Sequence, residues 1–196
     1  MSFPNQLSLL RIILAPIFLF FFLSDGGYDK ILSLVIYFIA TLTDWYDGIL
    51  ARKFGLISNF GIFIDPLADK ILTSLAFFGF HKLGYMPLWM VVLIVVRDIA
   101  ITVVRSYHEY KGHTMKTSFI AKAKTFIQMT YIFLIIVLVS LASLDIDETL
   151  KKVINDFLIS DFNYCLMLIV TLLTVYTGIS YFFEKRKIMK ESYENN

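Results

Sequence analysis

The chain has 196 residues, of which 58% are hydrophobic and only 17% are charged, and its net charge is +2. A soluble domain usually carries about 25% charged residues, and so small a net charge gives no reason to expect a nucleic-acid partner. Cys165 is the only cysteine, which excludes a disulfide within the chain and a cysteine pair for a metal or redox centre.

The apolar residues fall into six blocks, each near the length of about 20 residues that a helix needs to cross a bilayer. We therefore predict an all-α membrane protein with six transmembrane helices, over residues 7–23, 30–51, 57–81, 87–107, 119–143 and 163–183. The first block lacks a small-residue cleavage site, so we expect it to be retained rather than removed as a signal peptide. The more polar residues 145–161 predict a short surface helix. No long linker or internal repeat divides the chain, so we expect residues 1–196 to form a single domain.

Basic residues in the connections predict the orientation. With the N-terminus in the cytoplasm, twelve lysines and arginines lie at the cytoplasmic ends of the blocks and four at the opposite ends. Six spans then place the C-terminus in the cytoplasm as well. We expect the protein in the inner membrane of a bacterium, in contact with membrane lipid and with its site facing the cytoplasm.

Four aspartates in the second and third blocks form the main candidate site, since a carboxylate at mid-membrane costs roughly 2.5–3.5 kcal/mol. Asp44 and Asp47 lie about 60° apart around one helix, and Asp65 and Asp69 lie about 40° apart around the next. Two antiparallel helices could therefore present four carboxylates to one cleft. Their mutual repulsion predicts two divalent cations, and a site with only oxygen ligands suits Mg²⁺ or Mn²⁺. Paired metals of this kind serve displacement at phosphorus.

Small residues accompany the aspartates. Gly48 and Ala51 lie on or beside the stripe of Asp44 and Asp47, where a bulky side chain would block a ligand, and Gly61 lies one turn before Asp65. Arg52 follows Gly48 by one turn and offers a forked donor to phosphate.

The segment Asp44-Trp45-Tyr46-Asp47-Gly48-Ile49-Leu50-Ala51-Arg52 is followed by eight residues and then by Gly61, Asp65 and Asp69. This spacing, D-x2-D-G-x2-A-R-x8-G-x3-D-x3-D, resembles the signature of the CDP-alcohol phosphatidyltransferases at every defined position, and six spans are usual in that family. The resemblance implies transfer of a phosphatidyl group from a CDP-linked lipid to an alcohol, with release of CMP. It implies that the four aspartates bind two metal ions, and that Asp69 is the general base. The CDP-lipid would be bound by Gly48, Ala51, Arg52, Ser58, Gly61, Asn5 and Ser8.

Other segments resemble the phosphatidylglycerophosphate synthases of this family: Pro4 to Arg11 is similar to P-N-x-L-T-x-x-R, Asp65 to Lys70 to D-P-x-A-D-K, and residues 97–128 to their R-E…R…G…S…G-K-x-K-T-x-x-Q run. This implies CDP-diacylglycerol as donor and sn-glycerol 3-phosphate as acceptor. The acceptor phosphate would be bound by Arg105, Lys122, Lys124, Arg97 and Ser118. Because Arg97 lies deeper in its block, pairing with a carboxylate is the alternative for this residue.

Several alternatives remain open. Within the family, the acceptor could be phosphatidylglycerol, as in a cardiolipin synthase, or an inositol phosphate. Outside it, the aspartates could line the ion path of a cation transporter, although acids on two consecutive spans suit a one-sided site better. A non-catalytic membrane scaffold would leave the costly acids unexplained. A homodimer is also open, since the helices could pair with a second copy through the fifth or sixth span.

Overall fold

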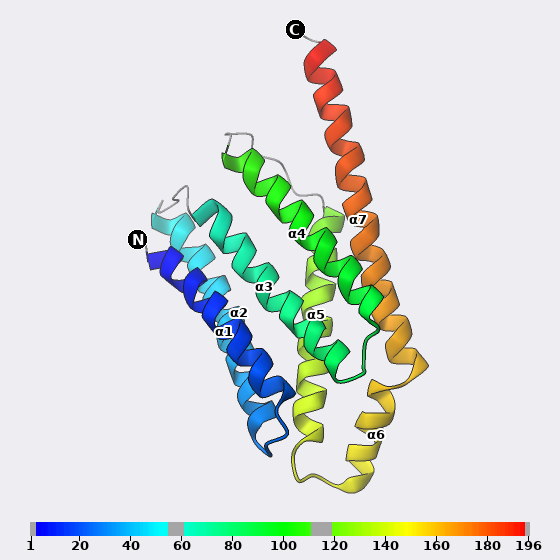
Figure 1. Cartoon of the computed structure of the whole chain (residues 1–196). Coiled ribbons are helices and arrows are strands. Elements are labelled where there is room, and N and C mark those ends of the chain that lie inside the picture. Colours follow the sequence, from blue (N-terminus) through cyan, green and yellow to red (C-terminus); the bar gives the residue numbers. More distant parts are fainter. Residues whose placement is uncertain (1–2, 55–60, 111–118, 195–196) are drawn as a thin grey trace.

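The computed structural model describes residues 3–54, 61–110 and 119–194, with side chains for all of these except 3–4, 45–54, 62, 109 and 182–194. Over the described ranges the chain is all-α and contains no strand (Figure 1). The helices are α1 (Phe3–Leu23), α2 (Asp29–Phe54), α3 (Gly61–Lys82), α4 (Leu88–Tyr110), α5 (Phe119–Ala142), α6 (Glu148–Leu158) and α7 (Asp161–Glu194).

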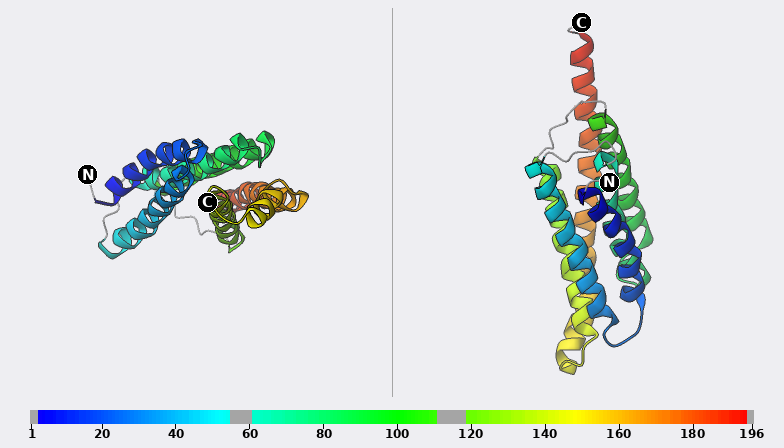
Figure 2. Two further views of the ribbon diagram at one scale, coloured as in Figure 1. Left: turned by 90° about the horizontal axis from the view of Figure 1, so that it is seen from below. Right: turned by 90° about the vertical axis from the view of Figure 1, so that its left-hand side faces the viewer.

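Consecutive long helices run in opposite directions along the bundle (Figure 1). The start of α1, the ends of α2 and α4 and the start of α3 therefore lie toward the same end, which we call the N-terminal end of the bundle. Helix α1 packs against α2 and α3, α3 packs against α4, and α4 packs against α7, while α5 contacts α2, α3 and α7. Figure 2 shows that α7 extends beyond the other helices at the N-terminal end.

Aromatic side chains fill the bundle away from the N-terminal end. The ring of Phe18 lies 5.4 Å from that of Phe22 and 5.3 Å from that of Tyr37 on α2. Phe22 in turn packs against Phe80 of α3, at 5.8 Å between centroids. Gly79 permits this approach, because a Cβ atom there would lie 2.8 Å from Phe22 Cδ1. Helices α1 and α3 are thus held together by a close aromatic contact.

The segment Gly84-Tyr85-Met86-Pro87 forms the turn between α3 and α4. Gly84 has a φ of +80°, a conformation that residues with a side chain rarely adopt. The amide of Tyr85 donates to the carbonyl of Phe80 at 2.9 Å. A ring nitrogen of His81 lies 3.0 Å from the carbonyl oxygen of Met86. These bonds end α3 and direct the chain into α4.

The predicted short helix within residues 145–161 is present as α6. It buries Ile154 and Leu158 against the bundle. Helix α7 then begins after Ser160, whose hydroxyl accepts a hydrogen bond from the amide of Asn163 at 3.1 Å. The side chain of Asn163 donates to the carbonyl of Leu158 at 2.7 Å and accepts from Tyr131 of α5 at 2.9 Å. The junction of α6 and α7 is thereby tied to α5.

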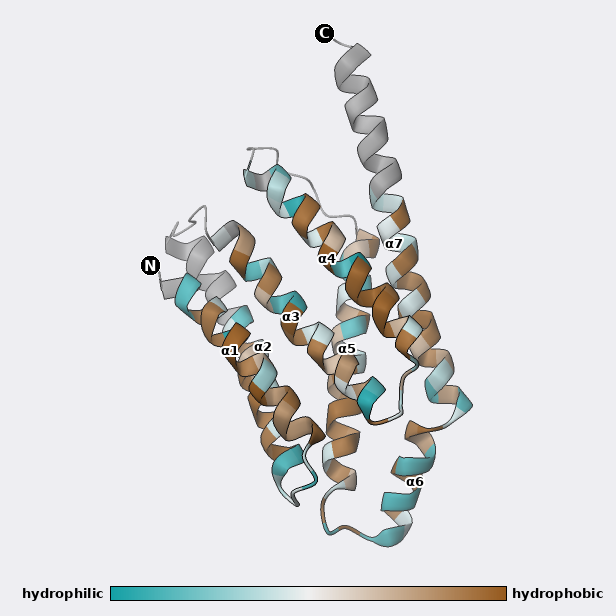
Figure 3. Ribbon diagram, in the orientation of Figure 1, coloured by the Kyte–Doolittle hydropathy of each residue, from teal (hydrophilic) through white to brown (hydrophobic). Residues whose placement is uncertain are grey.

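Within the described ranges, three helical segments are long and apolar enough to cross a membrane: Asn5–Leu23, Phe119–Ala142 and Asp161–Tyr181. Their presence identifies an integral membrane protein. Helices α2, α3 and α4 coincide with the other predicted spans, but each carries four or more charged residues. Hydrophilic residues interrupt the apolar stretches of α3 and α4 (Figure 3). That α2, α3 and α4 also cross the membrane stays a prediction.

Candidate active site

Three of the four predicted metal ligands have described side chains, and they come from two helices. Asp44 lies in the C-terminal half of α2, and Asp65 and Asp69 lie in the first half of α3. The carboxylate of Asp44 interacts electrostatically with both Asp65 and Asp69. These residues therefore form one charged group, here called the aspartate cluster. The side chain of Asp47 lies outside the described residues.

Helix α1 supplies partners to two members of this cluster. The hydroxyl of Ser8 donates to Oδ1 of Asp65. Nη1 of Arg11 lies 2.6 Å from Oδ1 of Asp44. Ser8 and Arg11 are both completely buried. The first turns of α1 therefore form a polar wall behind carboxylates that belong to α2 and α3.

Asp69 is held by the lysine that follows it. Nζ of Lys70 donates to Oδ2 of Asp69 at 2.8 Å, and the two side chains are 15% and 18% exposed. Lys70 also interacts electrostatically with Asp98 and Arg97 on α4. It therefore joins the aspartate cluster to a second group of charges between α3, α4 and α5.

Asp98 is the centre of this second group. Its Oδ1 accepts hydrogen bonds from Nζ of Lys124 at 2.6 Å and from Nη1 of Arg97 at 2.8 Å. Its Oδ2 accepts a bond from Nε2 of Gln128 at 3.1 Å. Asp98, Lys124 and Gln128 are all buried. A buried carboxylate needs such compensation, because an unpaired charge in a low-dielectric interior is strongly destabilising.

Helix α7 contacts the side chain of Arg97 through two residues. Nη2 of Arg97 donates to the hydroxyl of Thr177 at 2.7 Å. A Cβ atom on the adjacent Gly178 would lie 2.8 Å from Cγ of Arg97, so the glycine makes room for the arginine side chain. Sequence reasoning missed both residues. The only signal was a small residue and a hydroxyl in the last apolar block, a combination common in membrane helices.

The residues predicted to bind the acceptor phosphate lie in different surroundings. Lys124 and Arg97 both donate to Asp98, so for Arg97 the alternative of a carboxylate partner is the one observed. Lys122 is exposed in the first turn of α5, and Arg105 is half-buried near the end of α4. Ser118 lies outside the described residues.

Those residues predicted to bind the CDP-lipid that belong to described helices lie toward the N-terminal end of the bundle. Asn5 and Ser8 are buried on α1, and Gly61 is buried at the start of α3. Gly48, Ala51 and Arg52 belong to the last turns of α2, but their side chains lie outside the described residues, as does Ser58.

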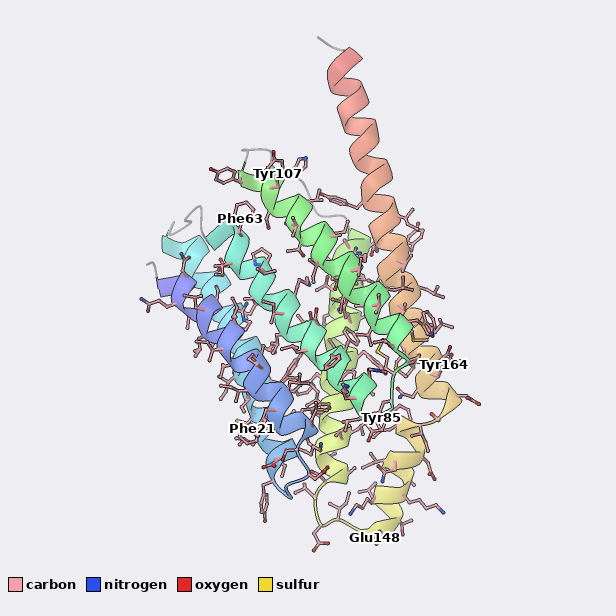
Figure 4. The ribbon with its side chains drawn as sticks, in the orientation of Figure 1. Phe21, Phe63, Tyr85, Tyr107, Glu148 and Tyr164 are labelled. Carbon is pink, nitrogen blue, oxygen red and sulfur yellow. The ribbon has the colours of Figure 1, made fainter. Side chains whose placement is uncertain are left out.

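Aromatic residues bring α3 and α4 together at this end of the bundle. The rings of Phe63 and Tyr110 are 5.7 Å apart, which places the start of α3 beside the end of α4. Figure 4 shows Phe63 and Tyr107 at the N-terminal end and Glu148 of α6 at the opposite end.

The aspartate cluster offers ligands that suit a hard divalent cation, although among the described side chains no group of three or more His, Cys, Asp or Glu is arranged to hold a metal ion. Each described carboxylate uses one oxygen on a protein donor: Oδ1 of Asp44, Oδ1 of Asp65 and Oδ2 of Asp69. No donor from the described side chains is found on the other oxygen of any of the three. The three carboxylates therefore offer only oxygen atoms as ligands, and one oxygen of each is available to a cation. Mg²⁺ and Mn²⁺ prefer such oxygen ligands.

Comparison with known proteins agrees with the resemblance found in the sequence. The family model for CDP-alcohol phosphatidyltransferase matches residues 1–176. A probable phosphatidylglycerophosphate synthase of Mycobacterium tuberculosis is 37% identical over 138 residues, which cover 69% of this chain and 66% of the relative, slightly less than two thirds of its length.

Two relatives carry the name CDP-diacylglycerol–glycerol-3-phosphate 3-phosphatidyltransferase. The protein from Bacillus subtilis is 34% identical over 140 residues, which cover 65% of this chain and 72% of the relative. The protein from Rickettsia bellii is 29% identical over 181 residues, which cover 92% and 93% of the two chains.

Proposed function

Because this chain belongs to the CDP-alcohol phosphatidyltransferase family, we propose that it transfers the phosphatidyl group of CDP-diacylglycerol to sn-glycerol 3-phosphate. The products are phosphatidylglycerophosphate and CMP, and the reaction is a step of phospholipid biosynthesis. The names of the relatives from B. subtilis and R. bellii support this donor and this acceptor. The observation in the structure that supports the reaction most directly is the aspartate cluster of Asp44, Asp65 and Asp69.

The proposed metal site consists of Asp44, Asp47, Asp65 and Asp69, with two divalent cations, Mg²⁺ or Mn²⁺. Bound there, the cations would neutralise charge that develops on the pyrophosphate of the donor. The charge balance supports this assignment: three described aspartates face the cations Arg11 and Lys70, and Asp47 adds a further acid. The cluster therefore has a negative surplus that a divalent cation would reduce.

In the proposed reaction, an acceptor hydroxyl oxygen attacks the phosphorus that carries the diacylglycerol. The bond between this phosphorus and the oxygen bridging it to the CMP phosphate breaks, and CMP leaves with that oxygen. The proton of the hydroxyl passes to Asp69, which acts as general base. Lys70 supports this role, because it holds Oδ2 of Asp69 and so orients the carboxylate.

The substrates are assigned to the two sides of the aspartate cluster. We assign the CDP-lipid to the start of α1, the end of α2 and the start of α3, through Asn5, Ser8, Gly48, Ala51, Arg52, Ser58 and Gly61. We assign the acceptor phosphate to Arg105 and Lys122, with Arg97, Lys124 and Ser118 as further candidates. Lys122, which is exposed on α5, is favoured as a direct phosphate ligand over Arg97 and Lys124, because these two residues are engaged with Asp98.

The same proposal includes the topology. Residues 1–196 form one membrane domain with six spans, α1 to α5 and α7, and both termini face the cytoplasm. The site then lies at the cytoplasmic side of a bacterial inner membrane, where water-soluble glycerol 3-phosphate is available. The N-terminal end of the bundle holds the aspartate cluster as well as the first turns of α1, which supports this placement (Figure 1).

An acceptor panel tests the proposed function. Purified protein would be given CDP-diacylglycerol and Mg²⁺ or Mn²⁺ with glycerol 3-phosphate, phosphatidylglycerol or inositol phosphate, and CMP release would be measured. We expect release with glycerol 3-phosphate alone. Release only with phosphatidylglycerol or inositol phosphate would overturn the acceptor but keep the family reaction. No release with any acceptor would overturn both and favour the transporter alternative.

A further inference from the structure

We propose that Arg11 is a positioning residue for the metal site: its buried guanidinium fixes the orientation of the Asp44 carboxylate, so that α1 forms a second layer behind the ligands of α2 and α3. This inference rests on the proposed function, because it assigns a task within that site.

The buried face of α1 changes character along its length. Its buried positions follow a helical spacing of three or four residues: Asn5, Ser8, Arg11, Ala15, Phe18 and Phe22. The last three are apolar and pack in the aromatic core, whereas the first three are polar. A packing helix of a membrane bundle has no need of an arginine on this face, since a charge inside the membrane is costly. The polar half of the stripe therefore indicates a task at the aspartate cluster.

Arg11 bridges two points on α2 that are one turn apart. Its Nε donates to the carbonyl oxygen of Ala40 at 3.2 Å, and its Nη1 lies 2.6 Å from Oδ1 of Asp44. The side chain is 0% exposed, whereas that of Asp44 is 45% exposed. The hydrogen bond at Nε holds the planar guanidinium in place, so that its positive charge lies at a fixed position beside the carboxylate. The buried arginine is thus the fixed partner, and the more exposed carboxylate takes its orientation from it.

The contact leaves the carboxylate able to bind a cation. Arg11 takes Oδ1 of Asp44, and no described side chain donates to Oδ2. Ser8 makes a similar contact with Asp65, since its hydroxyl donates a hydrogen bond to Oδ1 of that residue. Outer partners that orient a metal ligand commonly change metal affinity about 10–100-fold when they are removed. Loss of Arg11 should therefore weaken metal binding, an effect that is not expected if Arg11 only links α1 to α2.

Mn²⁺ titration of the purified full-length protein distinguishes a residue that positions a metal ligand from one that only links α1 to α2. The paramagnetic resonance signal of free Mn²⁺ reports the binding, so the measurement does not depend on turnover. The variants are Arg11→Met, Arg11→Lys, Asp44→Asn and the double variant Arg11→Met/Asp44→Asn. Gly79→Ala is the matched control, because its new Cβ presses on Phe22 and loosens α1 against α3 far from Arg11. The melting temperature of every variant is recorded beside its Mn²⁺ affinity.

We expect Arg11→Met to weaken Mn²⁺ binding about 10–100-fold. We expect Arg11→Lys to weaken it as well, because lysine keeps the charge but lacks the fork. In the Asp44→Asn background, Arg11→Met should cause no further loss, since the carboxylate ligand that Arg11 orients is already gone. Gly79→Ala should lower the melting temperature and leave Mn²⁺ affinity unchanged.

Wild-type Mn²⁺ affinity in Arg11→Lys and Arg11→Met, with only a lower melting temperature, would overturn the inference. Fully additive losses in the double variant would do the same. If Arg11→Met does not fold, Arg11→Lys and the double variant, which removes both charges, still decide the question. Failure of the wild-type protein to bind Mn²⁺ would overturn the proposed metal site together with this inference, whereas loss of the inference alone leaves wild-type binding intact.

Discussion

At the scale of single residues, the ion pair of Lys124 and Asp98 dominates the energetics of the second charged group. Their side chains are 3% and 2% exposed, and 2.6 Å separates Nζ from Oδ1. Removal of one member of a buried pair leaves the other charge uncompensated, which typically costs about 3–5 kcal/mol. Arg97 and Gln128 would still donate to Asp98, so the loss would lie toward the lower end of this range.

We therefore predict that Lys124→Met lowers the stability of the protein by about 3 kcal/mol. Lys122→Met is the matched control, because Lys122 lies two residues earlier on α5 and is exposed. Thermal unfolding in detergent should show a clearly lower melting temperature for Lys124→Met and almost none of this effect for Lys122→Met. Equal melting temperatures for the two variants would contradict the buried pair.

At the scale of helices, the contact between α4 and α7 depends on Gly178. Alanine there would place a Cβ atom 2.8 Å from Cγ and 3.1 Å from Nε of Arg97. The far end of Arg97 is tethered by Asp98 and Thr177, so the middle of the side chain has little freedom to yield.

We predict that Gly178→Ala displaces Arg97 and raises the KM for glycerol 3-phosphate several-fold, with a smaller change in kcat. Gly27→Ala is the control, since a Cβ atom at that position would contact nothing within 4 Å. Steady-state kinetics of CMP release compares the two variants. An unchanged KM in Gly178→Ala would show that Arg97 does not contribute to the acceptor side of the site.

The helices themselves could be predicted from the sequence, because their signal is local. Apolar blocks of sufficient length predicted α1 to α5 and α7, and the more polar residues 145–161 predicted α6. The spacing of Asp65 and Asp69 also predicted that these carboxylates share a face of one helix. Periodicity reports which residues share a face, but not which face of another helix they meet.

The contacts that hold the aspartates could not be predicted for this reason. Ser8 and Asp65 are 57 positions apart, and Arg97 and Thr177 are 80 positions apart. Such contacts depend on how each helix is rotated within the bundle. Arg11 could be identified as the end of the segment that resembles P-N-x-L-T-x-x-R, but nothing in the sequence indicated that its partner is Asp44.

At the scale of the whole molecule, the aspartate cluster lies on the halves of α2 and α3 nearer the N-terminal end, while the turn before α2 and helix α6 lie toward the other end (Figure 1). The excess of basic residues at the first end predicts that this end faces the cytoplasm. The proposed orientation therefore has a direct consequence for chemical accessibility.

We predict that single cysteines at the two ends react from opposite sides of the membrane. In a Cys165→Ser background, Gly27→Cys and Asp156→Cys should react with an impermeant maleimide in intact cells. Lys187→Cys should react only after the membrane is opened. The reverse pattern would invert the topology and place the aspartate cluster outside, away from cytoplasmic glycerol 3-phosphate.

The central claim is that the carboxylates between α2 and α3 carry out phosphatidyl transfer, with Asp69 taking the proton of the acceptor. The most direct measurement is the rate of CMP release from CDP-diacylglycerol with saturating glycerol 3-phosphate and Mg²⁺, for the wild-type protein and for Asp69→Asn. Asp156→Asn is the control, since Asp156 is exposed on α6 at the opposite end. We predict that Asp69→Asn loses at least about 100-fold in kcat while Asp156→Asn keeps the wild-type rate. A wild-type rate in Asp69→Asn would contradict it.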